Sequence, residues 1–172
     1  MGARIALVGE QPGDQEDQAG RPFVGPAGAI LDRALAEAGI TRTETYVTNA
    51  VKNFKFRQVG KRRLHQSPTV GDVKHYRWWL DRELELVRPA LVVALGATAT
   101  LALCGRRIAV TSHRGPTGFG GRRGYITVHP SSLLRLRDAD MRHLAYAAFV
   151  EDLIQARSLS EAAGTSFRRL GS

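Results

Sequence analysis

The sequence contains only one cysteine, Cys104, among its 172 residues. One thiol excludes a disulfide framework and also excludes any metal or iron–sulfur site that is built from several thiolates. Cys104 follows the apolar run Leu101–Leu103 and precedes Gly105, a setting typical of a buried structural thiol. We therefore expect no metal site and no cofactor.

Other common signatures are missing as well. No run of 18 consecutive apolar residues is present, which argues against a membrane span and a membrane partner. The start of the chain lacks the basic, apolar and small-residue regions of a signal peptide. The phosphate-binding patterns GxxxxGK[ST] and GxGxxG are absent, so a nucleotide-cradling loop is a weak hypothesis. These absences favour a cytoplasmic protein, associated with the nucleoid.

Acidic residues are missing from the stretch between Tyr46 and Gly71, although the whole chain has 16 of them against 25 basic residues, for a net charge of +9. The basic residues of this stretch are Lys52, Lys55, Arg57, Lys61, Arg62 and Arg63. A concentrated basic segment predicts contact with the phosphates of DNA. Alternatively the segment is only a solvated loop, but Phe54, Phe56 and Gly60 interleave with the charges and favour a shaped one.

Short apolar runs alternate with helical patterns along the chain. The expected strands are Arg4–Gly9, Thr45–Val51, Ala90–Leu95, Ile108–Thr111 and Tyr125–His129. The expected helices are Pro26–Gly39, Val70–Val87, with Trp78 among its inward residues, Ala97–Leu103 and Asp138–Ala156. This alternation predicts an α/β fold, a three-layer α/β/α sandwich around a mainly parallel sheet of four to five strands. Residues 1–157 form one domain, and residues 158–172 are expected to be a flexible or frayed tail.

Three polar segments each follow an expected strand: Gly9–Asp17, Asn49–Lys52 and His129–Arg135. Because ligand sites of such folds lie at the carboxyl ends of the strands, we expect these segments to meet on one rim. The first segment holds a carboxylate and a carboxamide, Glu10 and Gln11, in a turn constrained by glycine and proline. Glu10 could alternatively do no more than cap that turn.

Phe23 lies in a short loop between Gly20 and Gly25 that also contains a proline. An aromatic ring held in this way predicts a stacking platform for a nucleic-acid base. The alternative is that the ring only fills the core.

Three sequence motifs resemble those of a known family, and the resemblance covers the chain from Ile5 to about Leu153. GEQPGDQEDQAGRPFVGPAG (9–28), TNAVK (48–52) and HPSSLLR (129–135) resemble the motifs of family 4 uracil-DNA glycosylases. Gln11 after Glu10, and KRRLHQSP (61–68), resemble more closely the UdgX-type proteins, which cross-link themselves to uracil-DNA.

The resemblance implies roles for the catalytic residues. His65 matches the loop histidine that attacks the sugar and stays bonded to it. Glu10 is expected to orient His65 and to stabilise the sugar cation, and Gln11 to exclude or position water. His129 is expected to donate a hydrogen bond to the uracil O2 as negative charge develops. Without the resemblance, the alternatives are that His65 is only a solvated loop residue and that His129 is only a buried residue at the end of a strand.

The resemblance also implies how the substrate is held. Uracil leaves the duplex before it is bound. Asn49 is expected to pair with the edge of the base, unless it only forms a turn or a cap. The predicted substrate-binding residues are Phe23, Asn49, Gly9 and Asp14. The predicted DNA-binding residues are Lys52, Lys55, Arg57, Lys61, Arg62, Arg63, Ser131, Ser132 and Arg135.

One departure from the family concerns its iron–sulfur cluster. Asn53 and Tyr76 stand where the resemblance implies cluster ligands, and Cys104 cannot hold a cluster alone. We therefore predict that the cluster is absent and that Tyr76 and Phe54 fill its place.

Four functional hypotheses remain at this point. The first is single-turnover excision of uracil with covalent capture of the abasic sugar by His65. The others are a uracil-DNA glycosylase that turns over, a non-catalytic module that binds uracil-DNA, and an unrelated nucleotide-handling α/β enzyme. We expect uracil-containing DNA as the partner, single-stranded DNA to be preferred, and the protein to be a monomer.

Overall fold

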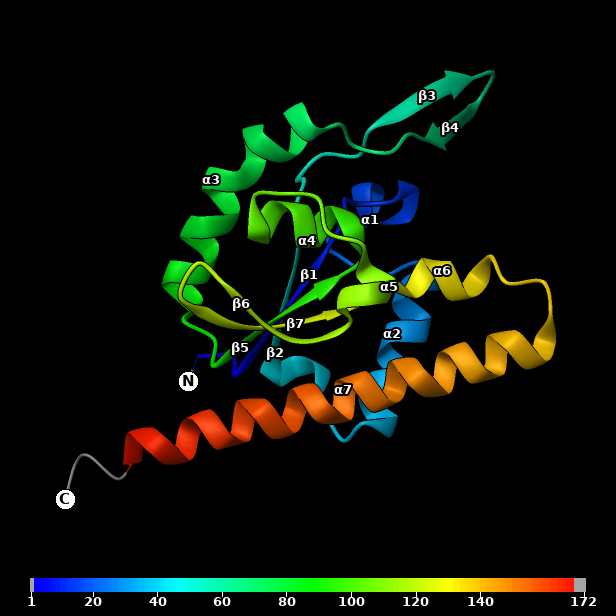
Figure 1. The fold of residues 1–172 in the computed structure, drawn as a ribbon. Helices are drawn as coiled ribbons and strands as arrows, with labels where there is room; N and C mark the ends of the chain where they lie inside the picture. The colour runs from blue at the N-terminus through cyan, green and yellow to red at the C-terminus, as the bar shows by residue number, and fades with distance from the viewer. Residues whose placement is uncertain (1, 169–172) are drawn as a thin grey trace.

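The computed structural model describes residues 2–168, and a five-stranded sheet with helices on both faces forms its centre (Figure 1). The strands lie in the order β2 (Thr45–Asn49), β1 (Ile5–Gly9), β5 (Leu91–Leu95), β7 (Arg122–Thr127) and β6 (Gly115–Phe119). All neighbours are parallel except β6, which is antiparallel to β7. The predicted α/β fold with a mainly parallel sheet is therefore confirmed.

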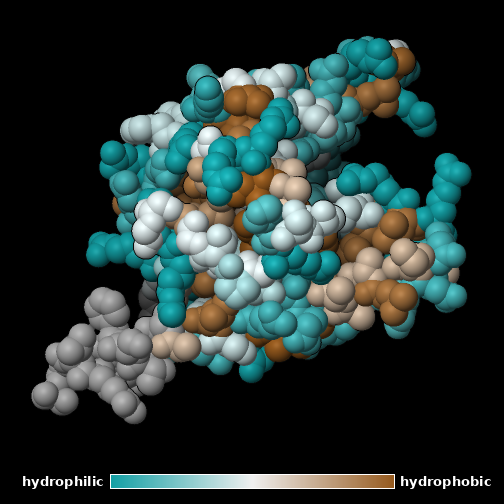
Figure 2. Space-filling model, viewed as in Figure 1, coloured by the Kyte–Doolittle hydropathy of each residue, from teal (hydrophilic) through white to brown (hydrophobic). Residues whose placement is uncertain are grey.

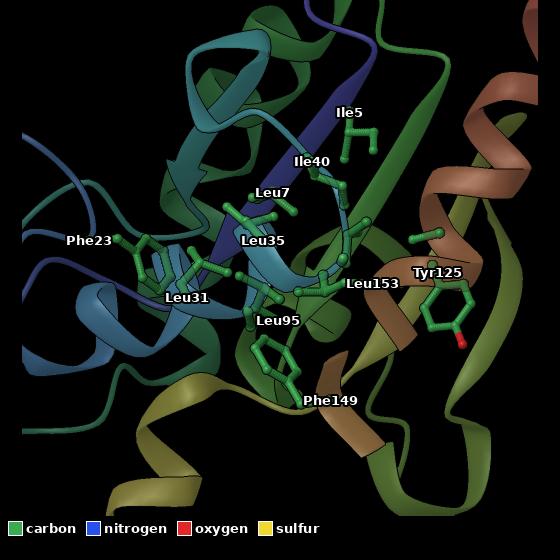
Figure 3. Close-up of a cluster of buried hydrophobic side chains, with 14 of the residues drawn as sticks. Ile5, Leu7, Phe23, Leu31, Leu35, Ile40, Leu95, Tyr125, Phe149 and Leu153 are labelled. Atoms are coloured by element: carbon green, nitrogen blue, oxygen red, sulfur yellow. The ribbon is translucent and has the colours of Figure 1, made fainter. Parts of the chain in front are cut away.

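The sheet is covered on both faces, and its central strands β1 and β5 are buried along their whole length. Ile5 and Leu7 of β1 belong to one core cluster, whereas Ala6 and Val8 belong to the other. The first cluster, drawn in Figure 3, is covered by α2 (Pro26–Glu37), α6 (Pro130–Leu134) and α7 (Ala139–Arg168). The second is covered by α3 (Val70–Val87) and α4 (Ala97–Cys104). Successive side chains of a strand point to opposite faces, which explains the division.

The basic segment between β2 and α3 forms a β-hairpin, where the sequence indicated only a shaped loop. Strand β3 (Phe56–Val59) pairs with β4 (Arg62–His65), and the hairpin projects from the body of the molecule (Figure 1). Gly60 in the tight turn has a φ of 57°, which glycine adopts without strain.

Two expectations near the end of the sheet are wrong. Residues expected as a strand at Ile108–Thr111 instead lead into the short helix α5 (Val110–His113), and the edge strand is β6. The sequence of β6, GPTGF, is rich in strand-breaking residues, which an edge strand tolerates because one side of its backbone is unpaired. The helix α1 (Asp14–Ala19) and the 3-10 turn η1 (Arg42–Glu44) were also not predicted.

The last helix continues beyond its expected end at Ala156. Leu159 packs against the first core cluster, and Ser160 is 2% exposed. The backbone oxygen of Ser160 accepts a hydrogen bond from the Arg4 guanidinium at 3.0 Å. These contacts extend α7 to Arg168, and the part of the predicted tail from residue 169 onward lies outside the described residues.

Trp78 does not point inward as expected. Trp78 and its neighbour Trp79 are 56% and 53% exposed and pack edge to face against each other on the outer side of α3. Within residues 2–168, no helix has the length and apolar character needed to cross a membrane.

Candidate active site

The carboxyl ends of β1 and β2 form the floor of the site. Gly9 and Asn49 are register partners at the last position of these two parallel strands. A Cβ atom on Gly9 would lie 2.5 Å from the Asn49 Oδ1 and 2.6 Å from the Phe23 Cζ, so only glycine fits there. No group in the described part of the chain hydrogen-bonds the Asn49 amide, which leaves it free to pair with a ligand.

Phe23 closes one side of this floor. It has a φ of 55°, a left-handed conformation that costs energy for a residue other than glycine, and it is 6% exposed. Its ring centroid lies 5.6 Å from that of His129, and Figure 3 shows it beside Leu31 at one end of the core cluster. Phe23 therefore both fills the core and lines the site.

His129 lies just beyond β7 and caps α6. Its Nδ1 accepts a hydrogen bond from the Ser131 backbone N–H at 3.1 Å, and the Ser132 hydroxyl donates to its carbonyl oxygen at 2.7 Å. Burial lowers the pKa of His129 to about 4, so the imidazole is neutral at neutral pH. A neutral ring that accepts at Nδ1 carries its proton on Nε2, the nitrogen left to donate to a ligand.

Glu10 connects the hairpin to the body of the protein. Its Oε1 lies 3.2 Å from the His65 Nε2, and its Oε2 accepts a hydrogen bond from the Thr98 hydroxyl at 2.5 Å. The sequence analysis predicted that Glu10 orients His65, but it did not include Thr98 among the site residues. The signal was present, because Thr98 follows β5 by three residues and so lies on the same rim as the other strand ends.

Gln11 holds the base of the hairpin, and its predicted role in excluding or positioning water stays a prediction. Its Nε2 donates to the backbone oxygens of Lys55 at 3.3 Å and Gln66 at 3.0 Å, and its Oε1 accepts from the Lys55 N–H at 3.2 Å. Lys55 and Gln66 flank the hairpin on its two sides, so one side chain that is 8% exposed fastens both ends.

A second attachment joins the hairpin to α1. The Arg63 guanidinium pairs with Asp14 at 2.5 Å and with Asp17 at 2.6 Å. It also lies over the Phe54 and Phe56 rings, at 5.3 and 5.1 Å from their centroids. Asp14 and Arg63 thus hold the hairpin against the body, and their predicted contacts with substrate and DNA stay predictions.

The remaining basic residues divide into paired and open ones. Lys52 is 23% exposed at its side chain and pairs with Glu83 at 2.7 Å, and burial lowers its pKa. Lys55 pairs with Asp72 at 2.6 Å and holds the pKa of that carboxyl well below its usual range. Each of these two lysines is thus paired with an acid in the structure, and their predicted contact with DNA stays a prediction.

Three predicted DNA-contacting residues remain exposed on the hairpin: Arg57, Lys61 and Arg62. Lys61 and Arg62 border an open groove of about 540 Å³ between the hairpin and α1. Figure 2 shows the surface hollowed beneath the projecting hairpin. On the opposite side of the site Arg135 is exposed and donates to the Ser131 hydroxyl at 3.4 Å. Cations thus lie on both sides of the site.

The residues at the predicted cluster positions do not fit an iron–sulfur cluster. Asn53 is exposed, and Tyr76 is half-buried against the second core cluster, with its ring edge to face against His75. Phe54 is 8% exposed and stacks on Phe56 rather than on Tyr76. Among the described residues no group of three histidine, cysteine or acidic side chains is placed to hold a metal.

Comparison with known proteins identifies the family. The uracil DNA glycosylase superfamily model matches residues 1–154. The chain is 37% identical over 167 residues to a type-4 uracil-DNA glycosylase of Thermotoga maritima, covering 95% of this chain and 81% of that protein. It is 34% identical to a type-4 enzyme of Pyrobaculum aerophilum (76% and 68% covered) and 33% identical to a type-5 enzyme of the same organism (77% and 63% covered).

These relatives support the predicted superfamily but do not test the predicted UdgX-type branch. They carry the names of type-4 and type-5 glycosylases, so likeness to the cross-linking UdgX-type branch stays a prediction. The wider assignment rests on a match that spans nearly the whole described chain. The chain belongs to the uracil-DNA glycosylase superfamily.

Proposed function

We propose that this protein excises uracil from DNA and that His65 then captures the abasic sugar covalently at C1′. The family and its type-4 relatives support uracil-DNA glycosylase activity. The observation that carries the second step is the 3.2 Å contact between the His65 imidazole and Glu10, at the rim that also holds Asn49 and His129.

Recognition of uracil is assigned to Asn49 and Phe23. The extruded base lies against Phe23, and the Asn49 amide donates to O4 and accepts from N3–H. Cytosine presents an amine in place of O4 and would leave the Asn49 donor unpaired, at a cost of about 1–3 kcal/mol. Thymine is excluded because its methyl group would clash with the wall of the pocket.

Bond cleavage is assigned to His129. The bond between C1′ and the uracil N1 breaks, its electron pair leaves with the base, and the sugar becomes a cation. The Nε2–H of neutral His129 donates to the uracil O2 as negative charge develops, a contribution of roughly 100- to 1000-fold. The Glu10 carboxylate opposes the positive charge on the sugar.

Capture is assigned to His65. A carboxylate that accepts one imidazole N–H leaves the other ring nitrogen with its lone pair, which forms the new bond to C1′. The N–H proton passes toward Glu10, and the uracil anion takes a proton from solvent. Imidazole is a poor leaving group from this carbon, so each molecule reacts once.

The proposal extends to cofactor and partner. The reaction runs without an iron–sulfur cluster, because Asn53 and Tyr76 offer no thiolate. The substrate is single-stranded uracil-DNA, since an unpaired base is extruded at least cost. We further propose that the protein acts on DNA as a monomer in the cytoplasm.

The test is intact mass spectrometry after incubation with a short single strand that contains one uracil. We expect a species with the mass of the protein plus the oligonucleotide minus uracil. The variant His65→Ala should lose this species, whereas His113→Ala, which changes an exposed histidine on α5, should retain it. An adduct that persists in His65→Ala would refute the assignment of the nucleophile.

A turning-over glycosylase is the second candidate, and the names of the relatives favour it. The ratio of released uracil to protein separates the two: one or fewer supports capture, and many support turnover. Binding of the uracil strand with no release of base would instead indicate a non-catalytic binding module.

A further inference from the structure

Thr98 begins a chain of contacts that ends at the proposed nucleophile. It is the second residue of α4, and its hydroxyl donates to the Glu10 Oε2 at 2.5 Å. The other carboxylate oxygen of Glu10 lies 3.2 Å from the His65 Nε2. The two oxygens of one carboxylate are therefore held from opposite sides, one by the body of the protein and one by the hairpin.

The two ends of this chain differ in how firmly they are attached. The turn before α4 is fixed to the sheet, because the Gly96 N–H donates to the Thr127 carbonyl of β7 at 2.9 Å. Gly96 has a φ of 91°, so the turn is sharp and specific. His65, in contrast, lies on a two-stranded hairpin, and such a ribbon is marginally stable without packing against the body.

We propose that Thr98 is a positioning residue that holds Glu10 in the rotamer in which one oxygen faces His65. This inference rests on the proposed capture by His65. A glutamate side chain has several rotatable bonds, and Glu10 is 27% exposed, so it is free to turn toward solvent unless a fixed donor holds it. Thr98 is such a donor.

The hydrogen bond also fixes where the charge of Glu10 lies. With one oxygen held by Thr98, the carboxylate stays in a position to oppose the positive charge that builds on the sugar and on the imidazole. No bond at Thr98 is made or broken, and its effect on the reaction passes through Glu10.

The variants Thr98→Val, Thr98→Ser and Thr100→Val form a matched set. Valine keeps the shape of threonine and removes the hydroxyl, whereas serine keeps the hydroxyl. Thr100→Val makes the same chemical change within α4, where the buried Thr100 hydroxyl donates to the Gly96 carbonyl at 2.8 Å and does not contact Glu10. The midpoint of thermal unfolding, measured for all three, reports any loss of stability.

Uracil release and adduct formation are measured under single-turnover conditions. We expect Thr98→Val to slow adduct formation roughly ten- to a hundredfold, the scale of one hydrogen bond to a charged group. Thr98→Ser keeps the hydroxyl and should restore the rate, which a purely structural role of the threonine methyl group would not explain. Thr100→Val should resemble the wild type.

Either of two results overturns the inference: Thr98→Val with the rate of the wild type, or Thr100→Val with the same loss as Thr98→Val. If the wild type forms no adduct, covalent capture fails, and uracil release then tests Thr98 alone. In that case slower release of uracil by Thr98→Val but not by Thr98→Ser supports the hold of Thr98 on Glu10, and release at the wild-type rate by Thr98→Val overturns it.

Discussion

Replacing Gln11 by alanine should separate the two proposed steps of the reaction. Gln11 makes three hydrogen bonds, and all of them go to the backbone at the base of the hairpin. None goes to Asn49, Phe23 or His129, the groups assigned to recognition and cleavage. The variant should therefore loosen the hairpin that carries His65 and leave the uracil pocket in place.

The size of the effect follows from these three bonds. A hydrogen bond between neutral groups contributes about 0.5–1.5 kcal/mol net. Water reaches the vacated backbone groups and recovers part of that energy, so we expect a loss of about 2 kcal/mol in the docking of the hairpin. A loss of this size lowers the equilibrium constant for docking of the hairpin roughly thirtyfold. The rate of capture should fall by up to the same factor.

The assay follows released uracil and the covalent adduct in the same single-turnover reaction. Gln58→Ala is the matched control, because Gln58 donates to the Gly60 carbonyl at 2.7 Å within the hairpin itself. The expected result is a large drop in adduct, near-normal uracil release for Gln11→Ala, and little change for Gln58→Ala. If adduct and uracil release fell together, or neither fell, the reasoning about Gln11 would be wrong.

Three further predictions concern pH, salt and stability. The pKa of buried His129 is about 4, below its unfolded value near 6.5, so the unfolded chain binds a proton first and stability falls as the pH drops through this window. Between pH 7 and pH 5, the free energy of unfolding measured with denaturant should therefore fall by about 2 kcal/mol more for the wild type than for His129→Gln. Lys52→Met should lower stability, because Glu83 loses its cation and keeps only the hydrogen bond from the Thr48 hydroxyl, but it should keep the salt dependence of DNA binding. Arg62→Gln should reduce the slope of log Kd against log salt for single strands by about 0.7, as measured by fluorescence anisotropy. Asp152→Asn should cost about 3 kcal/mol in denaturant unfolding, because this 7% exposed carboxylate is bonded to an arginine and to two hydroxyls of β7.

The centre of the sheet could be predicted because β1 and β5 are apolar along their whole length and glycine or proline lies at their ends. Leu91–Leu95 is an example of such a run. The edge strand β6 could not be predicted, because Gly115, Pro116 and Gly118 are residues that usually break strands and only the neighbouring β7 supports them. The end of α7 was missed for a related reason: Leu159 and Ser160 are buried by tertiary contacts that no local pattern records.

The residues of the site were found more readily than their contacts. Glu10, Asn49 and His129 follow strands, and parallel strand ends share one rim. Charge alone, however, did not distinguish Arg57, which is exposed, from Lys52, which is paired with Glu83. The acids that pair with Lys52, Lys55 and Arg63 lie outside the basic segment, so its local pattern does not reveal these ion pairs.

The arrangement of the site indicates why recognition and capture can vary independently in this fold. Gly9, Asn49 and His129 are set by the ends of sheet strands, so their positions depend on the core itself. His65 comes from a hairpin that the sheet does not include and that side chains of Gln11 and Arg63 fasten to the body. On the proposed mechanism, the pocket decides which base leaves, and the fastening of the hairpin decides whether imidazole or water meets C1′. A small change at the base of the hairpin is therefore enough to move such a protein between capture and turnover, without any change in the base that it recognises.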